Sequence, residues 1–133
     1  STQELFMDAF KTHGAFSWSE LLTSNPGAAT EFYGQLFNWT FDAMDMGSGT
    51  YHVAKLGESA IGGVSGFPPA APKMPSAWGV YITVNNLDST VRECQALGGT
   101  LCSGPFDVPG VGRMAVLQDP QGAVFNVMAY DQE

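Results

Sequence analysis

Two stretches of the chain read as the same module written twice. The first runs from Phe16 to Phe37 and the second from Ala77 to Leu97, so their first residues lie 61 positions apart (77 − 16 = 61). Each contains an alternating strand pattern, an asparagine suited to a helix N-cap and one amphipathic helix, with further strand patterns behind it. One such module cannot close a hydrophobic core alone. The duplication therefore predicts two half-cups that face each other around a cavity.

Turn residues divide the chain into the parts of a single expected domain. We expect an apolar arm (1–14), a first module (15–67), a Pro-rich linker (68–76) and a second module (77–130) within residues 1–133. In each module one strand and one helix precede three strands. The prediction is an α+β fold in which two tandem βαβββ modules form a cupped mixed sheet.

The first helix has a clear apolar stripe. Its members recur at helical spacing and predict the face that packs on the sheet: Ala29, Phe32, Tyr33, Leu36 and Phe37. With 133 residues, 44% hydrophobic and 14% charged, the chain is long enough to bury roughly two thirds of the surface that its unfolded form exposes.

Charge and composition exclude several classes of partner. Thirteen acidic and five basic residues give a net charge of −8, and the basic residues are scattered, so nucleic acid and anionic membranes are poor partners. No apolar run approaches the ~20 residues of a membrane span, and the N-terminus lacks the pattern of a signal peptide. We expect a cytoplasmic protein in which Cys94 and Cys102 are free thiols.

Three motifs carry a family resemblance. They are Phe32-Tyr33, the segment Val108-Pro-Gly-Val-Gly-Arg113, and the segment Gln118-Asp-Pro-Gln-Gly-Ala-Val-Phe125 before the last strand. With the two βαβββ modules, they resemble the vicinal oxygen chelate superfamily of glyoxalase I, bleomycin-resistance proteins and extradiol dioxygenases. The opening His13-Gly-Ala-Phe-Ser-Trp-Ser-Glu-Leu21 is similar to uncharacterised glyoxalase-like and hydroxylase-like proteins. The resemblance implies the fold but not the reaction, because this fold hosts several chemistries and also proteins with none.

The resemblance also implies where a metal would bind. Metal-dependent members use three or four His or Glu ligands, and here their first, third and fourth positions fall on Trp18, Gly79 and Asn126. The second position falls on Gly62 or Gly63. These residues lack the carboxylate and imidazole donors that a divalent ion requires. We therefore predict no metal or other cofactor, with a strand shift or a site built from Glu20 and His52 as the alternative.

Two residues are candidate catalytic groups. Glu20 alternates onto the same face as Trp18, where an apolar pocket would raise its pKa toward that of a general base. Tyr81 occupies the equivalent position of the second module (20 + 61 = 81) and is a candidate proton donor or anchor. The structural alternatives are a solvated or backbone-bonded Glu20 and a Tyr81 that packs in the core with its hydroxyl satisfied.

Other residues are candidates for ligand binding. They are Trp18, Gly79, Arg113, Asn126 and Met128. Arg113 could bind a carboxylate or phosphate, or form a surface ion pair, and Met128 could line the cavity or belong to the ordinary core. The side of its strand that His52 faces is open, and His13 is expected at the surface.

Two classes of function fit these residues. The first is a protein that binds a small apolar or aromatic compound in the cup without a metal. The second is a glyoxalase-like lyase or isomerase that uses Glu20 as general base; a metal-dependent lyase or dioxygenase is a weaker third. The apolar arm, with Leu5, Phe6 and Phe10, favours a homodimer.

Overall fold

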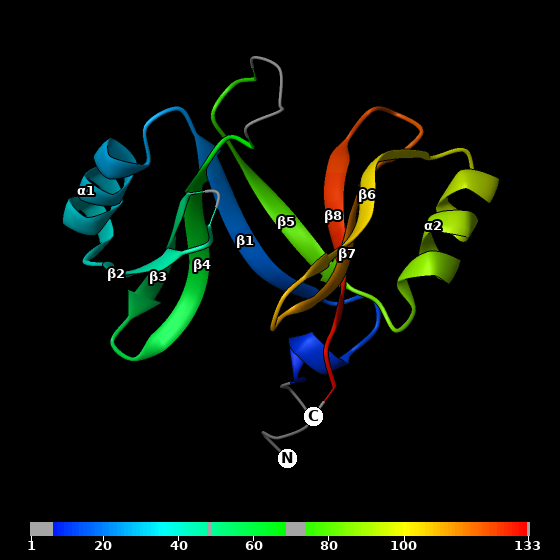
Figure 1. Ribbon diagram of the computed structural model, residues 1–133, viewed down its shortest axis with the longest axis horizontal. Coiled ribbons are helices and arrows are strands. Elements are labelled where there is room, and N and C mark those ends of the chain that lie inside the picture. Colours follow the sequence, from blue (N-terminus) through cyan, green and yellow to red (C-terminus); the bar gives the residue numbers. More distant parts are fainter. Residues whose placement is uncertain (1–6, 48, 69–73, 133) are drawn as a thin grey trace. The chain divides into compact units, whose positions relative to one another are not determined.

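The computed structural model describes residues 7–47, 49–68 and 74–132. Its helices and strands follow the predicted order, twice a strand, a helix and three further strands (Figure 1). Their bounds are β1 (Phe16–Thr23), α1 (Pro26–Phe37), β2 (Thr40–Asp45), β3 (Thr50–Leu56), β4 (Ser59–Gly66), β5 (Ala77–Thr83), α2 (Leu87–Ala96), β6 (Thr100–Val108), β7 (Gly112–Gln118) and β8 (Val124–Tyr130). A short 3-10 helix, η2 (Ala9–Lys11), precedes β1.

The two modules also repeat their helix starts. Asn25 accepts a 3.0 Å hydrogen bond from the backbone N–H of Ala28, and Asn86 accepts one of 2.9 Å from that of Ser89. Both side chains satisfy N–H groups that a helix leaves unpaired at its first turn. These asparagines therefore set where α1 and α2 begin, as the sequence predicted.

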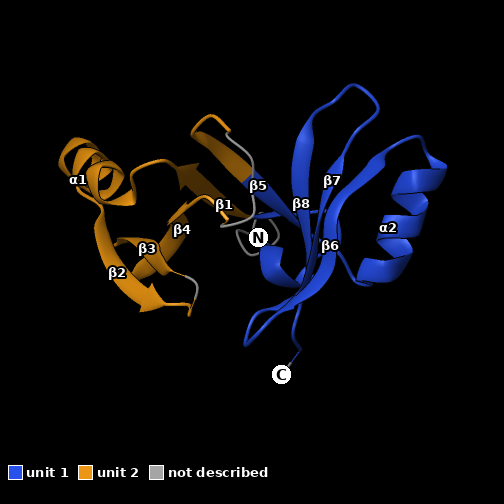
Figure 2. Cartoon of the chain, turned by 45° about the horizontal axis from the view of Figure 1, so that its top comes forward, with its two compact units in different colours: residues 1–17, 80–133 blue, residues 18–79 orange. Residues whose placement is uncertain are grey.

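Two compact units make up the chain (Figure 2). Unit 1 comprises Ser1–Ser17 with Val80–Glu133, and unit 2 comprises Trp18–Gly79. In unit 2 the strand order is β2-β3-β4-β1, with β1 parallel to β4. In unit 1 the order is β5-β8-β7-β6, with β5 parallel to β8. All other pairs within these two sets are antiparallel, which confirms the predicted α+β fold of mixed βαβββ modules.

Unit 1 holds a hydrophobic core between α2 and its sheet. Leu87 and Val91 of α2 are buried together with Leu117 of β7 and Val127 of β8. Partly buried neighbours, among them Cys94, extend this cluster. Cys94 and Cys102 form no disulfide, as expected.

Helix α1 of unit 2 differs from α2 because none of its residues is buried. Phe32, Leu36 and Phe37 are 60%, 57% and 51% exposed, so the predicted buried stripe is wrong for these three residues. At Gly34 of this helix, a Cβ would lie 3.3 Å from the backbone oxygen of Trp39, in the connection to β2, and 3.8 Å from the ring of Phe41 on β2.

The described end of the N-terminal arm packs on the rest of unit 1, to which it belongs. Phe10 lies edge-on against Tyr130, with ring centroids 5.0 Å apart, and the Thr83 hydroxyl donates a 2.6 Å hydrogen bond to the backbone oxygen of Ala9. Leu5 and Phe6, the other two arm residues that were expected to favour a dimer, lie outside the described residues. Within the part of the chain that the structure describes, no helix is long and apolar enough to cross a membrane.

Candidate functional site

Strand β1 presents Trp18 and Glu20 on one face of the unit 2 sheet, because alternate residues of a strand point to the same side. The register of β1 with β4 pairs Glu20 with Gly63, so Gly63 shares this face. Leu21 pairs with Val64 and points to the opposite side, where both are buried. We call the side with Trp18 and Glu20 the carboxylate face, and the opposite side, with Leu21 and Val64, the helix face.

Tyr51 of β3 reaches across β4 to Trp18. Its hydroxyl accepts a 2.8 Å hydrogen bond from the indole Nε1–H of Trp18. Val53 pairs with Gly63, so Tyr51, two residues before Val53, lies on the carboxylate face as well. Gly63 makes the crossing possible, since a Cβ at this position would overlap the Tyr51 ring and hydroxyl. The half-buried indole of Trp18 is thereby held in one orientation on the face that carries Glu20.

The role of Tyr51 was not predicted from the sequence. A signal for it was present, because a glycine inside a strand marks a place where another group approaches the backbone closely. Gly62 and Gly63 are two such residues in the middle of β4, and the Cβ that each lacks would collide with a neighbour. A Cβ on Gly62 would lie 2.8 Å from the backbone oxygen of Ser19, and a Cβ on Gly63 would overlap the side chain of Tyr51.

Three other predicted residues share one face of the unit 1 sheet. Tyr81 pairs with Asn126 across β5 and β8, and Met114 pairs with Met128 across β7 and β8. Tyr81 and Met128 are buried, and the Tyr81 hydroxyl lies 3.9 Å from the sulfur of Met114. The amide Nδ2 of Asn126 donates a 3.2 Å hydrogen bond to the backbone oxygen of Val80. Unit 1 therefore brings together Tyr81, Asn126 and Met128.

Glu20 and Tyr81 belong to different compact units. Their joint role as catalytic groups therefore stays a prediction. Gly79, another candidate for ligand binding, is the last residue of unit 2.

Tyr130 lies at the end of β8 and has a hydroxyl partner on β1. Its Oη is 2.8 Å from the Oγ of Ser17, which also donates a 3.4 Å hydrogen bond to the backbone oxygen of Tyr81. Burial raises the pKa of the Tyr130 hydroxyl, and the hydrogen bond with Ser17 opposes this shift. The phenol is thus held in its protonated form beyond its ordinary range.

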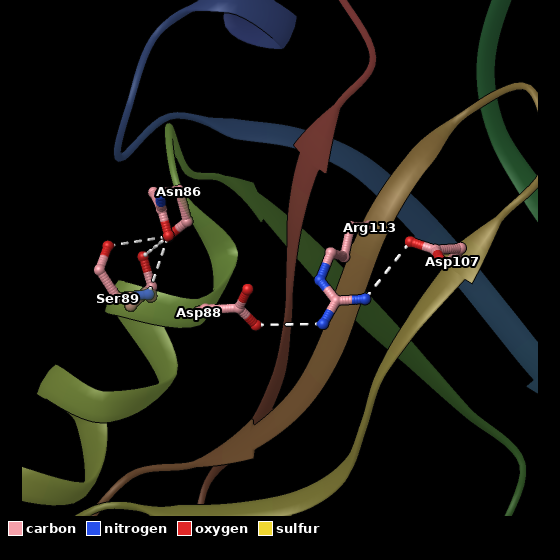
Figure 3. Close-up of polar contacts among 6 residues, drawn as sticks. Asn86, Asp88, Ser89, Asp107 and Arg113 are labelled. Carbon is pink, nitrogen blue, oxygen red and sulfur yellow. Dashed lines mark hydrogen bonds and ion pairs between the residues drawn. The ribbon is translucent and has the colours of Figure 1, made fainter.

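Arg113 does not share a face with Asn126 and Met128. It pairs with Ala129 in the register of β7 and β8, one residue out of step with the Met114–Met128 pair. Its guanidinium contacts Asp88 at 3.2 Å and Asp107 at 3.4 Å, as Figure 3 shows. The hydrogen bond with Asp88 raises the pKa of Arg113. Desolvation partly opposes this rise, and the contact with Asp107 adds to it. The surface ion pair, one of the two predicted alternatives, is thus the observed contact.

The two histidines have different surroundings. His52 pairs with Val64 and therefore lies on the helix face, opposite Glu20. A metal site built from Glu20 and His52 is thereby excluded. His13 is exposed, and its Nδ1 accepts a 2.9 Å hydrogen bond from the backbone N–H of Asn85.

Comparison with known proteins identifies the family. Residues 19–128 match the family model described as "Glyoxalase-like domain". The chain belongs to this family. It is thereby a member of the vicinal oxygen chelate superfamily that the sequence motifs resemble.

Two curated relatives resemble this glyoxalase-like domain. The protein named "Putative glyoxylase CFP32" from Mycobacterium tuberculosis is 40% identical over 116 residues, which cover 86% of this chain and 44% of that protein. The protein named "Anthracycline biosynthesis protein DauV" from Streptomyces sp. strain C5 is 32% identical over 127 residues, covering 86% of this chain and 46% of that protein. The glyoxalase-like chain thus spans less than half the length of these relatives.

A solved structure supports the fold of the glyoxalase-like domain. The methylmalonyl-CoA epimerase of Mycobacterium tuberculosis aligns with a TM-score of 0.63 over 99% of this chain and 97% of that chain. Its sequence identity is 13%, so the likeness concerns the fold alone.

The residues of this glyoxalase-like domain do not fit the metal site of the superfamily. Trp18 and Asn126 both use their side-chain N–H groups as hydrogen-bond donors, and Gly79 has no side chain to offer. Over residues 7–47, 49–68 and 74–132, no three His, Cys, Asp or Glu residues gather as metal ligands would. This donor chemistry lacks the anionic and imidazole groups that bind a divalent ion.

Proposed function

We propose that this glyoxalase-like domain binds a small apolar or aromatic compound against the carboxylate face of unit 2. The observation that supports this proposal is the 2.8 Å hydrogen bond that fixes the Trp18 indole on Tyr51 above Gly63. A ring that is already fixed loses little conformational freedom when a ligand packs on it. Offset or edge-to-face contacts between aromatic rings add about 0.5–1.5 kcal/mol beyond the area that they bury.

Glu20 gives the proposed site its polar group. It lies half-buried on the same face as the Trp18 indole, where a carboxylate can accept a hydrogen bond from a hydroxyl or N–H group of the ligand. Such a contact would fix the orientation of a ligand whose rings pack on Trp18. Tyr81, Asn126 and Met128 share a face of unit 1 and remain proposed ligand contacts, as does Gly79.

The name of one relative agrees with a ligand of this chemistry. DauV is named for anthracycline biosynthesis, and anthracyclines are compounds of fused aromatic rings. We extend this ligand class to the present chain as part of the proposal. A flat, mainly apolar compound of this kind suits a rigid indole with one nearby carboxylate.

A second candidate function is catalysis of proton transfer. The carboxylate of Glu20 shares its face with an indole, and CFP32 is named as a glyoxylase. In this alternative Glu20 removes a proton next to a carbonyl group, and Tyr81 keeps its predicted role as proton donor. The reaction class would be that of a lyase or isomerase.

Glu20→Gln separates the two candidates. A panel of small aromatic compounds, including 1-naphthol, indole and hydroxyanthraquinones, would be titrated by calorimetry and then incubated with the protein to detect products. We expect compounds that bind the wild type to bind Glu20→Gln within several-fold and to remain unconverted. Turnover by the wild type that Glu20→Gln abolishes would establish the enzyme instead.

Trp18→Ala tests the wall of the site itself. We expect affinity to fall about tenfold or more, which corresponds to 1.4 kcal/mol of lost contact. Leu56→Ala is the matched control, since it removes an exposed apolar side chain from the same unit at the end of β3. Equal affinities of the wild type and Trp18→Ala would contradict the proposal.

A homodimer remains a proposal for the assembly of the chain. Phe10, one of the apolar residues of the arm that the structure describes, packs on Tyr130 of its own unit, whereas Met7 is 67% exposed. Light scattering after size exclusion at micromolar concentration would distinguish a dimer from a monomer. Loss of the dimer in Phe10→Ala would assign the arm to the interface.

A further inference from the structure

Two adjoining pockets lie on the helix face of unit 2. The first, of about 330 Å³, is lined by Leu21 of β1 and by residues of α1. The second, of about 290 Å³, is lined by Trp39 together with Ala54 and Gly62, which pair in the register of β3 and β4. Trp78 lines both pockets and is their common wall. They open on the side opposite Trp18 and Glu20, since Leu21 alternates with Glu20 along β1.

Aromatic rings form the walls of these pockets. Tyr33 stacks on Trp39, with ring centroids 5.6 Å apart and planes inclined by 18°. Trp78 stands edge-on to both rings, at interplanar angles of 80° to Tyr33 and 89° to Trp39. Its indole N–H donates a 3.1 Å hydrogen bond to the Tyr33 hydroxyl, which fixes the common wall. Trp78 and Phe32 are 43% and 60% exposed, so ring surface is available to a ligand.

The lining defines the charge of a suitable ligand. None of the residues that line either pocket carries a charged side chain. Polar side chains that line the first pocket already form hydrogen bonds within the protein. Asn25 caps α1, and the hydroxyl of Ser76 donates a 3.3 Å hydrogen bond to the hydroxyl of Thr23. A charged group would lose hydration here without gaining an ionic partner. The chemistry therefore favours a neutral ligand.

Volume and ring geometry narrow the class further. Pockets of about 300 Å³ lie at the small end of the range for small-molecule sites. Ring faces and edges that meet at right angles complement a further flat ring, which can stack on one wall and meet the other edge-on.

We propose that the pockets on either side of Trp78 form a second binding site, which takes a small, neutral, planar aromatic compound. This site is independent of the function proposed for the carboxylate face, because the two occupy opposite sides of one sheet. Either site can exist without the other.

The indole N–H signals of Trp18, Trp39 and Trp78 report on the two faces separately, and these are the three tryptophans of the chain. We would record them by nitrogen-15 NMR, assign them with Trp→Phe variants and titrate the protein with 1-naphthol. The proposal predicts that the Trp39 and Trp78 signals shift and saturate. Cyclohexanol is neutral but not aromatic, and 1-naphthoate is aromatic but ionised. Each should bind with an affinity at least about tenfold lower than that of 1-naphthol.

Ala29→Leu tests the location of the site. It places a larger side chain in the first pocket, and Gln35→Leu adds the same side chain at an exposed position of α1 outside both pockets. We expect Ala29→Leu to weaken the response of Trp78 about tenfold, and Gln35→Leu to leave it unchanged. In both variants the response of Trp18 should match that of the wild type, so failure at one face is distinguishable from failure at the other.

Three results would overturn the inference. Trp39 and Trp78 signals that stay in place up to the solubility limit of 1-naphthol would exclude an aromatic site. An equal response to cyclohexanol would mean that the pockets do not select aromatic rings. Signals that shift with protein concentration alone would show that a second copy of the chain covers this face.

Discussion

The indole Nε1–H of Trp18 donates a 2.8 Å hydrogen bond to the hydroxyl of Tyr51, with the backbone of Gly63 between their strands. The two aromatic residues are 33 positions apart in the sequence, and the absence of a Cβ at Gly63 leaves the space in which they meet. The orientation of the tryptophan thus depends on a tyrosine and a glycine from two other strands.

Gly63→Ala should lower the free energy of unfolding by about 1–3 kcal/mol, the usual cost of forcing extra atoms into a packed site. The new methyl group would displace the Tyr51 ring and break its hydrogen bond with Trp18. Urea unfolding followed by circular dichroism measures the loss. Gly66→Ala is the control on the same strand, because its Cβ would lie 3.7 Å from the nearest atom outside the adjacent residues. Equal stability of the two variants would argue against the close approach of Tyr51.

Tyr51→Phe should weaken ligand binding at the carboxylate face several-fold, because the Trp18 indole loses the acceptor that orients it. The broken hydrogen bond should also cost about 0.5–1.5 kcal/mol of stability. Tyr33→Phe is the matched control, since it removes the acceptor of the Trp78 indole on the other face. The idea fails if both variants weaken the response of the Trp18 indole N–H signal equally in titrations with the same compound.

Arg113→Ala should leave ligand affinity unchanged and cause a small loss of stability. Its guanidinium pairs with Asp88 and Asp107 at exposed positions, where salt screens the attraction. The stability difference from the wild type should shrink between low salt and 1 M salt, at which the screening length falls to about 3 Å. Arg92→Ala, which removes a positive charge from an exposed position of α2, controls for net charge. A ligand that binds Arg113→Ala more weakly than Arg92→Ala would show that Arg113 contributes to ligand binding, contrary to this prediction.

Tyr130→Phe should make stability less sensitive to alkaline pH. Burial raises the pKa of Tyr130 in the folded chain, whereas in the unfolded chain the phenol ionises at about pH 10. Below that pH both states hold the proton and the stabilisation is complete. As pH rises further, the unfolded state loses its proton first, so stability falls until the pH passes the folded pKa.

Urea midpoints of the wild type and Tyr130→Phe at about pH 8 and pH 10.5 test this sign. The wild type should lose more stability between the two values than the variant does. Ser17→Ala, which removes the hydrogen bond that opposes the shift, should raise the pKa of Tyr130 further. Identical losses in the wild type and Tyr130→Phe would show that Tyr130 is not the group responsible.

Much of the fold could be predicted because its signals are local. Asn25 and Asn86 cap the helices from their own side chains, and alternation along β1 places Trp18 and Glu20 on one face whatever lies beside them. Such features depend on residues a few positions apart, so a single sequence contains them in full.

The parts that could not be predicted depend on pairing between strands. The register of β3 with β4 places His52 on the other face of the sheet from Glu20. The register of β7 with β8 likewise places Arg113 on the other face from Met128. A shift of one residue would reverse either result, and alternation alone does not fix the register. The exposure of Phe32 on α1 could not be predicted for a similar reason. Helical periodicity identifies an apolar face of the helix but not whether another element covers it.

Titration of the Ala29→Leu variant with small aromatic compounds, observed at the indole N–H of Trp18, tests the central claim most directly. This variant narrows the first pocket of the helix face, and Trp18 lies on the opposite side of the sheet, so a response of Trp18 reports on the carboxylate face. The account predicts that at least one compound of the panel shifts the Trp18 signal to saturation, and that Tyr51→Phe weakens this response. A Trp18 signal that no compound moves would contradict it.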